Sequence, residues 1–190
     1  EKVKTACSRQ QWEEAAQELL AYYRNRTDIA HPDIDLKNLA ISKEEQKWAD
    51  DAMDHTFFVH KGYQPSYNYG KDINWEYWPV KDNELRWQLH RHKWFTPMGK
   101  AYRISGDEKY AKEWAFQYID WIKKNPLVKM EKENFELVSA GEVKEDADNV
   151  HFAWRQLEVS NRLQDQTCQF LLFCPAEAFT PEFLTEFLVN

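Results

Sequence analysis

The chain has 190 residues and a formal net charge of −7, from 25 Lys and Arg against 32 Asp and Glu. This length predicts one domain or slightly more, and the acidity argues against binding nucleic acid, whose phosphates require a basic surface. Its five glycines are few for an all-β sandwich or a nucleotide-binding loop. No apolar run approaches the ~20 residues that a membrane span needs. The composition is therefore that of a globular protein, with an unusually high aromatic share of 15%.

The two ends and the cysteines carry less information. The start, EKVKTACSRQQ, is too polar for a signal peptide, so the chain is either cytosolic or a mature form whose signal has been removed. Cys7, Cys168 and Cys174 have no metal-binding spacing, and their odd number leaves at least one thiol unpaired. The last residues, TPEFLTEFLVN, begin a helix at Pro181, and we expect the protein to continue beyond Asn190.

Six segments show a helical period or helix-capping residues. They span residues 8–26, 42–55, 82–106, 108–124, 151–165 and 181 to the end. Ser8 with Gln11, and Ser42 with Glu45, have the pattern of a capping box, and Asp82 is the N-cap of the third helix. The irregular spacing of these helices predicts an all-α fold class built of stacked helical hairpins.

Two long connections separate these helices. Residues 56–80 have no helical period but contain eight aromatic residues, and so many rings argue against disorder. Residues 127–149 are charged and almost free of rings, which predicts a mobile loop. Because loops of this length in a compact domain are usually functional or disordered, the aromatic loop is the better candidate for a functional role.

The stretch from residue 78 to 95, WPVKDNELRWQLHRHKWF, gathers cations and tryptophans in an acidic chain. Between residues 81 and 103 the sequence has six Lys or Arg and two carboxylates, a local net charge of +4. A local positive field attracts an anion to one site, and the planar guanidinium of Arg suits carboxylate or sulfate. Since tryptophan faces suit the C–H side of a sugar ring, the combination favours an anionic sugar polymer.

A helical wheel places several of these residues on one face. That face contains Asn83, Arg86, Trp87, His90, Arg91 and Trp94. A second interpretation stays open, in which the cations form ion pairs with neighbouring helices and the tryptophans belong to the core. His90 and His92 do not form a metal pair, because side chains two residues apart on a helix point ~200° apart. No metal or other cofactor is expected.

Four segments resemble a known family. They are GKDINWEYWPVKDNELRWQLHRHKW (70–94), GDEKYAKEWAFQYIDWIKKNP (106–126), WRQLEVSNRLQ (154–164) and AFTPEFLTEFL (178–188). This pattern resembles the N-terminal helical domain of the heparin-sulfate lyases of the heparinase III type, within the wider heparinase II/III group of polysaccharide lyases. The resemblance covers most of the chain, and the block from 70 to 126 is its most specific part.

The resemblance implies an incomplete (α/α) toroid, followed in the complete enzyme by a β-sandwich domain that is absent from this chain. The reaction it implies is β-elimination, in which the C5 proton of a uronic acid is removed and the glycosidic oxygen at C4 leaves. In the family an Asn within a Gly-Asn-His sequence neutralises the substrate carboxylate, and a Tyr and a His handle the protons. The present sequence contains no Gly-Asn-His, so we expect every catalytic residue to lie beyond Asn190.

The resemblance carries over binding residues only. It predicts that the side chains facing the substrate cleft are Asn83, Arg86, His90, Arg91 and Arg155. It predicts that the rim of the cleft is formed by Tyr69, Asn74 and Trp75. Glu84 and Glu158 are predicted to hold the arginines in position, because a carboxylate would repel an anionic substrate.

The expected substrate is an acidic polysaccharide of the heparan sulfate type, and the missing part of the same chain is an expected partner. The resemblance further implies a bacterial protein that is periplasmic or secreted. Three alternatives stay open: a lyase for alginate or another uronate polymer, a glycoside hydrolase on a helical toroid, and a binding module without catalysis. The hydrolase would need two carboxylates about 5–10 Å apart, and no such pair stands out in the sequence.

Overall fold

The fold of the chain is all-α, as predicted. A computed structural model describes residues 1–126 and 152–189, and the charged loop predicted at 127–149 lies outside these residues. Within them the helices are α1 Lys2–Ser8, α2 Trp12–Arg24, α3 Lys43–Ala52, α4 Asn83–Leu89, α5 Phe95–Ser105, α6 Glu108–Lys124, α9 Gln156–Phe173 and α10 Pro181–Val189. The strands β1 Thr56–Phe57 and β2 Tyr67–Asn68 form a short antiparallel pair. No helix in the described ranges has the length and apolarity that a bilayer span requires.

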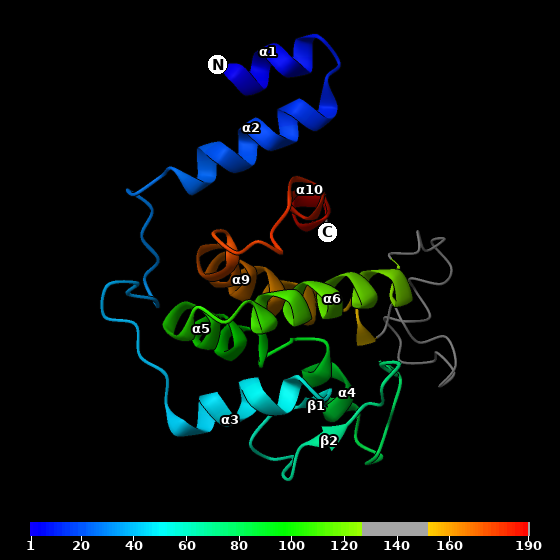
Figure 1. Ribbon diagram of the computed structural model, residues 1–190. Helices are drawn as coiled ribbons and strands as arrows, with labels where there is room; N and C mark the ends of the chain where they lie inside the picture. The colour runs from blue at the N-terminus through cyan, green and yellow to red at the C-terminus, as the bar shows by residue number, and fades with distance from the viewer. Residues whose placement is uncertain (127–151, 190) are drawn as a thin grey trace.

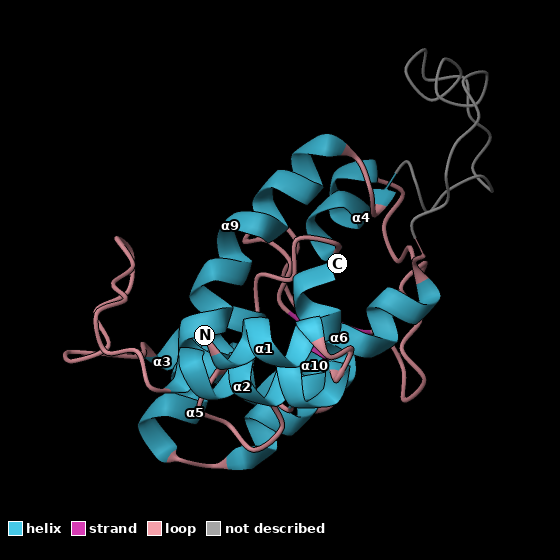
Figure 2. Ribbon diagram, turned by 90° about the horizontal axis from the view of Figure 1, so that it is seen from above, coloured by secondary structure: helices cyan, strands magenta, loops and turns pink. Residues whose placement is uncertain are grey.

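The helices lie in stacked layers (Figure 1). Helices α5, α6 and α9 form the middle layer, and α3 with the β1–β2 pair packs on one side of it. Helix α10 lies on the other side and contacts α2, which in turn packs against α1. The view from above shows α1 and α2 lying over α10 (Figure 2). The part of the chain that the structure describes is thus centred on α5, α6 and α9.

The N-terminal helix predicted from residue 8 to 26 corresponds to α2, which begins later, at Trp12, and a separate helix, α1, precedes it. Helix α1 ends at Ser8, whose Oγ donates to the carbonyl oxygen of Thr5 at 2.8 Å. Gln10 follows with a φ of 59°, and Gln11 precedes α2 without capping it through its side chain. The predicted capping box at Ser8 is therefore wrong, because this serine closes one helix instead of opening the next.

Helix α3 begins with the capping box that the sequence predicts. The amide of Glu45 donates to Ser42 Oγ at 3.0 Å, and the amide of Ser42 donates to Glu45 Oε2 at 2.9 Å. Two backbone donors at the open end of the helix are thereby satisfied. The helix ends at Ala52, three residues before the predicted position.

Replacing Ser42 by alanine is expected to lower the free energy of unfolding by about 1 kcal/mol, since an N-cap acceptor is lost. Urea unfolding followed by circular dichroism would measure the change. Ser8→Ala is the matched control, because the Ser8 hydroxyl caps no helix N-terminus and its loss should change the free energy much less. Equal losses in the two variants would contradict the role of the capping box.

The helix predicted from residue 82 to 106 is broken in the middle. Asp82 caps α4 by accepting from the amide of Glu84 at 2.9 Å, as predicted. The chain then leaves the helix at His90, passes through His92 with a φ of 53°, and re-enters α5 at Phe95. Pro97 supplies the reason, since inside one continuous helix its ring would clash with the carbonyl group four residues earlier. In the observed structure it lies in the first turn of α5, where proline is tolerated.

Of the three remaining helix predictions, two have their starts confirmed and one is displaced. Asp107 accepts from the amide of Lys109 at 3.0 Å and begins α6, which ends at Lys124 as predicted. Thr180 Oγ1 accepts from the amide of Phe183 at 3.1 Å at the start of α10. The helix predicted at 151–165 instead begins at residue 156 and runs to residue 173.

Stacked aromatic rings fill the core. Trp114 of α6 stacks on Phe173 of α9 with ring centroids 4.0 Å apart, and Trp94 stacks on Phe57 at 4.1 Å. Gly99 of α5 lies so close to α9 that a Cβ atom there would be 2.8 Å from Leu172. Four rings of the aromatic loop at 56–80 also enter the core, those of Phe57, Phe58, Tyr69 and Trp75, whereas Tyr77 stays exposed.

Candidate functional site

The aromatic loop is tied to the start of α4, where the predicted binding residues begin. Tyr63 donates its hydroxyl hydrogen to Asp82 Oδ2 at 2.6 Å, and Trp78 Nε1 donates to the Asp82 carbonyl oxygen at 3.0 Å. The hydrogen bond from Tyr63 and the one from the Glu84 amide hold the pKa of Asp82 below its usual value. Asn83, the first residue of α4, is exposed beside this junction.

Arg86 is buried, which corrects its predicted position at the face of a cleft. Its side chain is 5% exposed, and the guanidinium carbon lies 3.7 Å from the ring centroid of Phe152 and 5.4 Å from that of Trp78. A guanidinium over aromatic faces gains a cation–π attraction that grows when water is excluded. Arg86 therefore joins the aromatic loop to the segment before α9.

His90 is also buried, and its predicted exposure to a cleft is wrong. The residue is 2% exposed, and its Nδ1 accepts a hydrogen bond from Trp121 Nε1 at 3.1 Å. Burial, with the nearby charges of Arg162 and Arg86, lowers the pKa of His90 to about 3. The ring is therefore neutral at physiological pH, and its role in this structure is to pack α4 against α6.

Arg91 and Arg155 meet at a buried carboxylate. Arg91 donates to Glu158 Oε1 at 2.8 Å, and Arg155 donates to both oxygens of the same carboxylate, one of them at 2.7 Å. Glu84 lies on the other side of Arg91 at 3.5 Å. The structure thus brings both arginines together with the two carboxylates expected beside them. We call Glu84, Arg91, Arg155 and Glu158 the Glu158 cluster.

The charges of the Glu158 cluster suit a structural role better than the binding of an anion. The side chain of Glu158 has no exposed area. Burial raises its pKa, but the hydrogen bonds from Arg155 and Arg91 outweigh this effect, so the net pKa is lowered. Because the cluster contains two cations and two carboxylates, it carries no excess positive charge. Arg155 is the more exposed of the two arginines, with 30% of its side chain exposed against 12% for Arg91, and its guanidinium lies 3.7 Å from the Trp87 ring centroid.

Arg162 is a structural residue that the sequence did not single out. It is 5% exposed and donates to the carbonyl oxygens of His90 at 3.0 Å and Ala153 at 2.6 Å. Burial lowers its pKa to about 10, so it remains charged at neutral pH. The signal in the sequence was its position four residues after Glu158, which places both on one face of α9.

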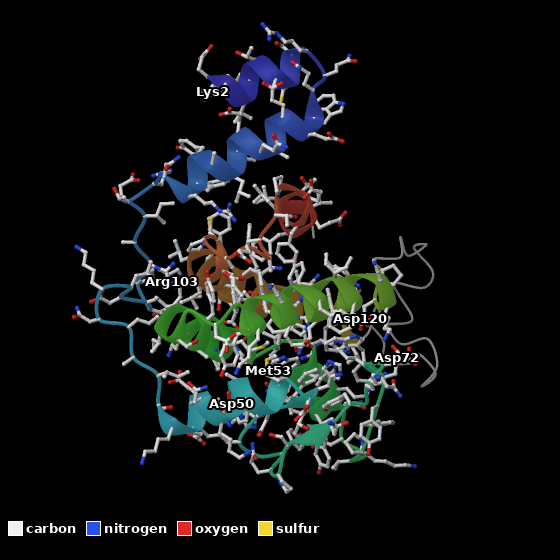
Figure 3. The ribbon with its side chains drawn as sticks, in the orientation of Figure 1. Lys2, Asp50, Met53, Asp72, Arg103 and Asp120 are labelled. Atoms are coloured by element: carbon white, nitrogen blue, oxygen red, sulfur yellow. The ribbon has the colours of Figure 1, made fainter. Side chains whose placement is uncertain are left out.

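The three predicted rim residues differ in how far they are buried. Tyr69 and Trp75 are each 2% exposed, so their predicted rim position is wrong, whereas Asn74 is exposed. Trp75 Nε1 donates to Asp120 Oδ2 at 2.8 Å, and Figure 3 shows Asp120 and Asp72 at the same end of α6. Burial raises the pKa of the Tyr69 hydroxyl. Both rings therefore belong to the core that supports the loop.

The positive charge counted between residues 81 and 103 is compensated in three dimensions. Lys93 pairs with Asp165 at 2.8 Å and Lys100 pairs with Glu45 at 2.5 Å, and Arg91 pairs with Glu158. Each of these carboxylates comes from another helix, so the surplus in the local sequence does not produce an equal surplus on the surface. In the ranges 1–126 and 152–189, no group of three His, Cys, Asp or Glu side chains could hold a metal ion.

Comparisons with known proteins agree on the family. The family model described as Heparinase II/III N-terminus matches residues 1–190. The chain is 68% identical to a heparin-sulfate lyase of Bacteroides stercoris over 190 residues, and 46% identical to one of Pedobacter heparinus over 195 residues. These alignments cover 100% and 99% of the chain but only 28% and 27% of the relatives.

Solved structures share the fold. The heparinase III BT4657 gene product with methylated lysines matches with a TM-score of 0.90 at 74% identity, covering 100% of this chain and 29% of that one. The heparan sulfate lyase HepC from Pedobacter heparinus matches with a TM-score of 0.84 at 45% identity, covering 99% and 28%. The chain spans less than a third of the length of these relatives. It belongs to the heparinase II/III family and corresponds to the N-terminal region of its members.

Proposed function

We propose that the protein to which this chain belongs is a polysaccharide lyase that cleaves heparan sulfate by β-elimination at uronic acid residues. The observation that carries the proposal is the identity of 68% over the whole chain with a heparin-sulfate lyase. The structural match to heparinase III, with a TM-score of 0.90, supports the same conclusion. Neither comparison favours alginate or another uronate polymer as substrate.

The chemistry explains why this chain would not act alone. The C5 proton of a uronate is very weakly acidic, so a lyase must neutralise the adjacent carboxylate and place a base and an acid within hydrogen-bond reach. The sequence has no Gly-Asn-His. His90 and Tyr69, which could be considered for proton transfer by residue type, are 2% exposed. We therefore assign the proton transfers to residues beyond Asn190.

The contribution of this chain would be a rigid wall of the substrate site. In the family the helical region forms an incomplete (α/α) toroid, and the layered helices described above suit one part of such a ring. Among the residues predicted for binding, Asn74 and Asn83 are exposed, and Arg155 and Arg91 are partly exposed. Arg155 is oriented by Glu158 and is the strongest candidate for contact with an anionic group, since a charge-assisted hydrogen bond exceeds a neutral one.

Digestion of heparan sulfate by the full-length protein tests the proposal. We expect an unsaturated product, detected by its ultraviolet absorbance, and no turnover by the 190-residue chain. Parallel digestions of alginate and chondroitin separate the possible substrates. Turnover of alginate without turnover of heparan sulfate would replace the proposed substrate, and turnover by the 190-residue chain would contradict the placement of the catalytic groups.

A further inference from the structure

A hollow of about 480 Å³ lies between α3 and α5. Its walls come from α3, from the segment after β1, from the end of α4, from one face of α5 and from α9. None of Asn83, Arg86, His90, Arg91 or Arg155 lines it. We call it the α3–α5 hollow. Its volume is within the usual range for small-molecule sites, about 300–1,000 Å³.

Two stacked aromatic residues line the α3–α5 hollow. Trp48 of α3 stacks on Phe58 with ring centroids 3.6 Å apart and an interplanar angle of 10°. Phe58 is buried at 8% exposure, whereas Trp48 is only partly buried. One indole face is therefore supported by the core, and the residue still reaches the hollow. Pro97 extends the apolar wall along α5.

A largely buried amide provides a hydrogen-bonding group that the core leaves unused. Gln88 lines the α3–α5 hollow and is 7% exposed. Its Nε2 donates to Glu84 Oε1 at 2.6 Å, but in the described ranges no donor contacts its Oε1. Because this oxygen is not sealed from solvent, a ligand hydroxyl or amide hydrogen can replace water as its donor. His60 offers the complementary group, because its Nδ1 accepts from the Gly62 amide at 3.1 Å and its Nε2 carries the ring hydrogen.

The charges around the α3–α5 hollow are balanced. The charged lining residues are Lys61, Lys93 and Lys100, with Asp33, Glu45 and Asp165. Two of the lysines already contact carboxylates of this set, at 2.8 Å and 2.5 Å. A sulfate or carboxylate group would therefore meet as many negative as positive charges. A hydroxyl-rich neutral group, in contrast, finds both donors and acceptors around a flat apolar surface.

We propose that the α3–α5 hollow binds an uncharged sugar ring. The ring places its C–H face on Trp48, a hydroxyl or amide hydrogen donates to Gln88 Oε1, and His60 and the lysines donate to its oxygens. This site adjoins the Glu158 cluster through the hydrogen bond from Gln88 to Glu84, but it takes a neutral unit instead of an acidic one. The proposal does not rest on lyase activity, because a saccharide can bind here without being cleaved.

Saturation-transfer difference NMR on the full-length protein tests the site, with N-acetylglucosamine as the neutral probe and glucose 6-sulfate and inorganic sulfate as anionic ones. We expect N-acetylglucosamine to receive saturation and its affinity to fall at least tenfold in Trp48→Leu and in Gln88→Leu. Trp12→Leu and Gln64→Leu are the matched controls, since both residues are exposed and neither lines the hollow. The affinity of these two control variants for N-acetylglucosamine should equal that of the unchanged protein.

Three results would overturn the proposal. They are no saturation of N-acetylglucosamine, tighter binding of glucose 6-sulfate or sulfate that weakens in Lys61→Ala, and equal losses in the control variants. If Trp48→Leu or Gln88→Leu fails to fold, His60→Ala replaces it, because His60 is exposed. That variant should weaken binding of the neutral probe while its melting temperature stays unchanged, and unchanged binding would count against the site.

Discussion

Acidification from pH 7 to pH 4 is expected to destabilise the folded chain steeply, because two histidines are buried in the neutral form. His90 and His92 are 2% and 3% exposed. Burial and the charges of Arg162 and Arg86 lower the pKa of His90 to about 3, and burial with Arg162 and His90 lowers the pKa of His92 well below 6.5. Unfolded histidine titrates near a pKa of about 6.5. The unfolded state therefore binds protons first as the pH falls.

The sign and size of this effect follow from proton linkage. A group whose folded pKa is depressed stabilises the fold above its unfolded pKa, and this stability is lost as the pH falls. Between about pH 6.5 and the folded pKa, each such histidine shifts the unfolding equilibrium constant about tenfold per pH unit. For His90 this window extends to about pH 3. Glu158, whose folded pKa is also lowered, adds a loss in the same direction, but only once the pH falls to the ordinary glutamate pKa of about 4.3.

Urea unfolding at pH 7, 5.5 and 4 measures the slope. His90→Gln removes one titrating group and keeps an acceptor for Trp121, so its stability should depend less steeply on pH. His60→Gln is the control, because His60 is exposed and should leave the slope unchanged. If His90→Gln and the unchanged chain lose stability in parallel, His90 is not the buried neutral group described above.

Replacing Glu158 by glutamine is expected to cost roughly 3–5 kcal/mol of unfolding free energy, the usual effect of removing one partner from a buried ion pair. Arg91, with 12% of its side chain exposed, and Arg155 would lose the carboxylate that both contact. Of the carboxylates in the described ranges, Glu84 alone would then remain in contact with these two neighbouring cations, beside Arg91. Thermal and urea unfolding of the purified variant measure the loss.

Two further variants test the explanation. Glu14→Gln removes an exposed carboxylate from α2 and should change the free energy of unfolding by less than about 0.5 kcal/mol. Combining Glu158→Gln with Arg91→Met removes the buried cation together with its partner, and should recover part of the loss. A loss below about 1 kcal/mol in Glu158→Gln would show that the cluster is solvated.

Local patterns in the sequence were sufficient to predict where four of the helices start. Ser42, Asp82, Asp107 and Thr180 each cap a helix through a side chain that lies within three residues of the amide it satisfies. The break between α4 and α5 could also have been predicted, since proline disfavours the interior of a continuous helix and Pro97 lies inside the range 82–106. The wheel drawn through that break placed residues of α4 and residues of the connection that follows it on one apparent face.

Burial of the predicted binding residues could not be read from the local sequence. The partner of His90 is Trp121, 31 positions away, and the partner of Arg91 is Glu158, 67 positions away. A charge count over residues 81–103 contains neither partner. The aromatic loop posed the same problem, because the stacking partner of Phe57 is Trp94, on the far side of α4 in the sequence.

The close approach of α5 and α9 at Gly99 restricts how this protein can vary. Alanine stabilises an isolated helix by about 1 kcal/mol relative to glycine, yet a methyl group at position 99 would meet Leu172 at 2.8 Å and Phe173 at 3.1 Å. The poorer helix former is therefore the one compatible with the interface. An engineer seeking a more thermostable form by the common exchange of helical glycines for alanine should leave this position untouched.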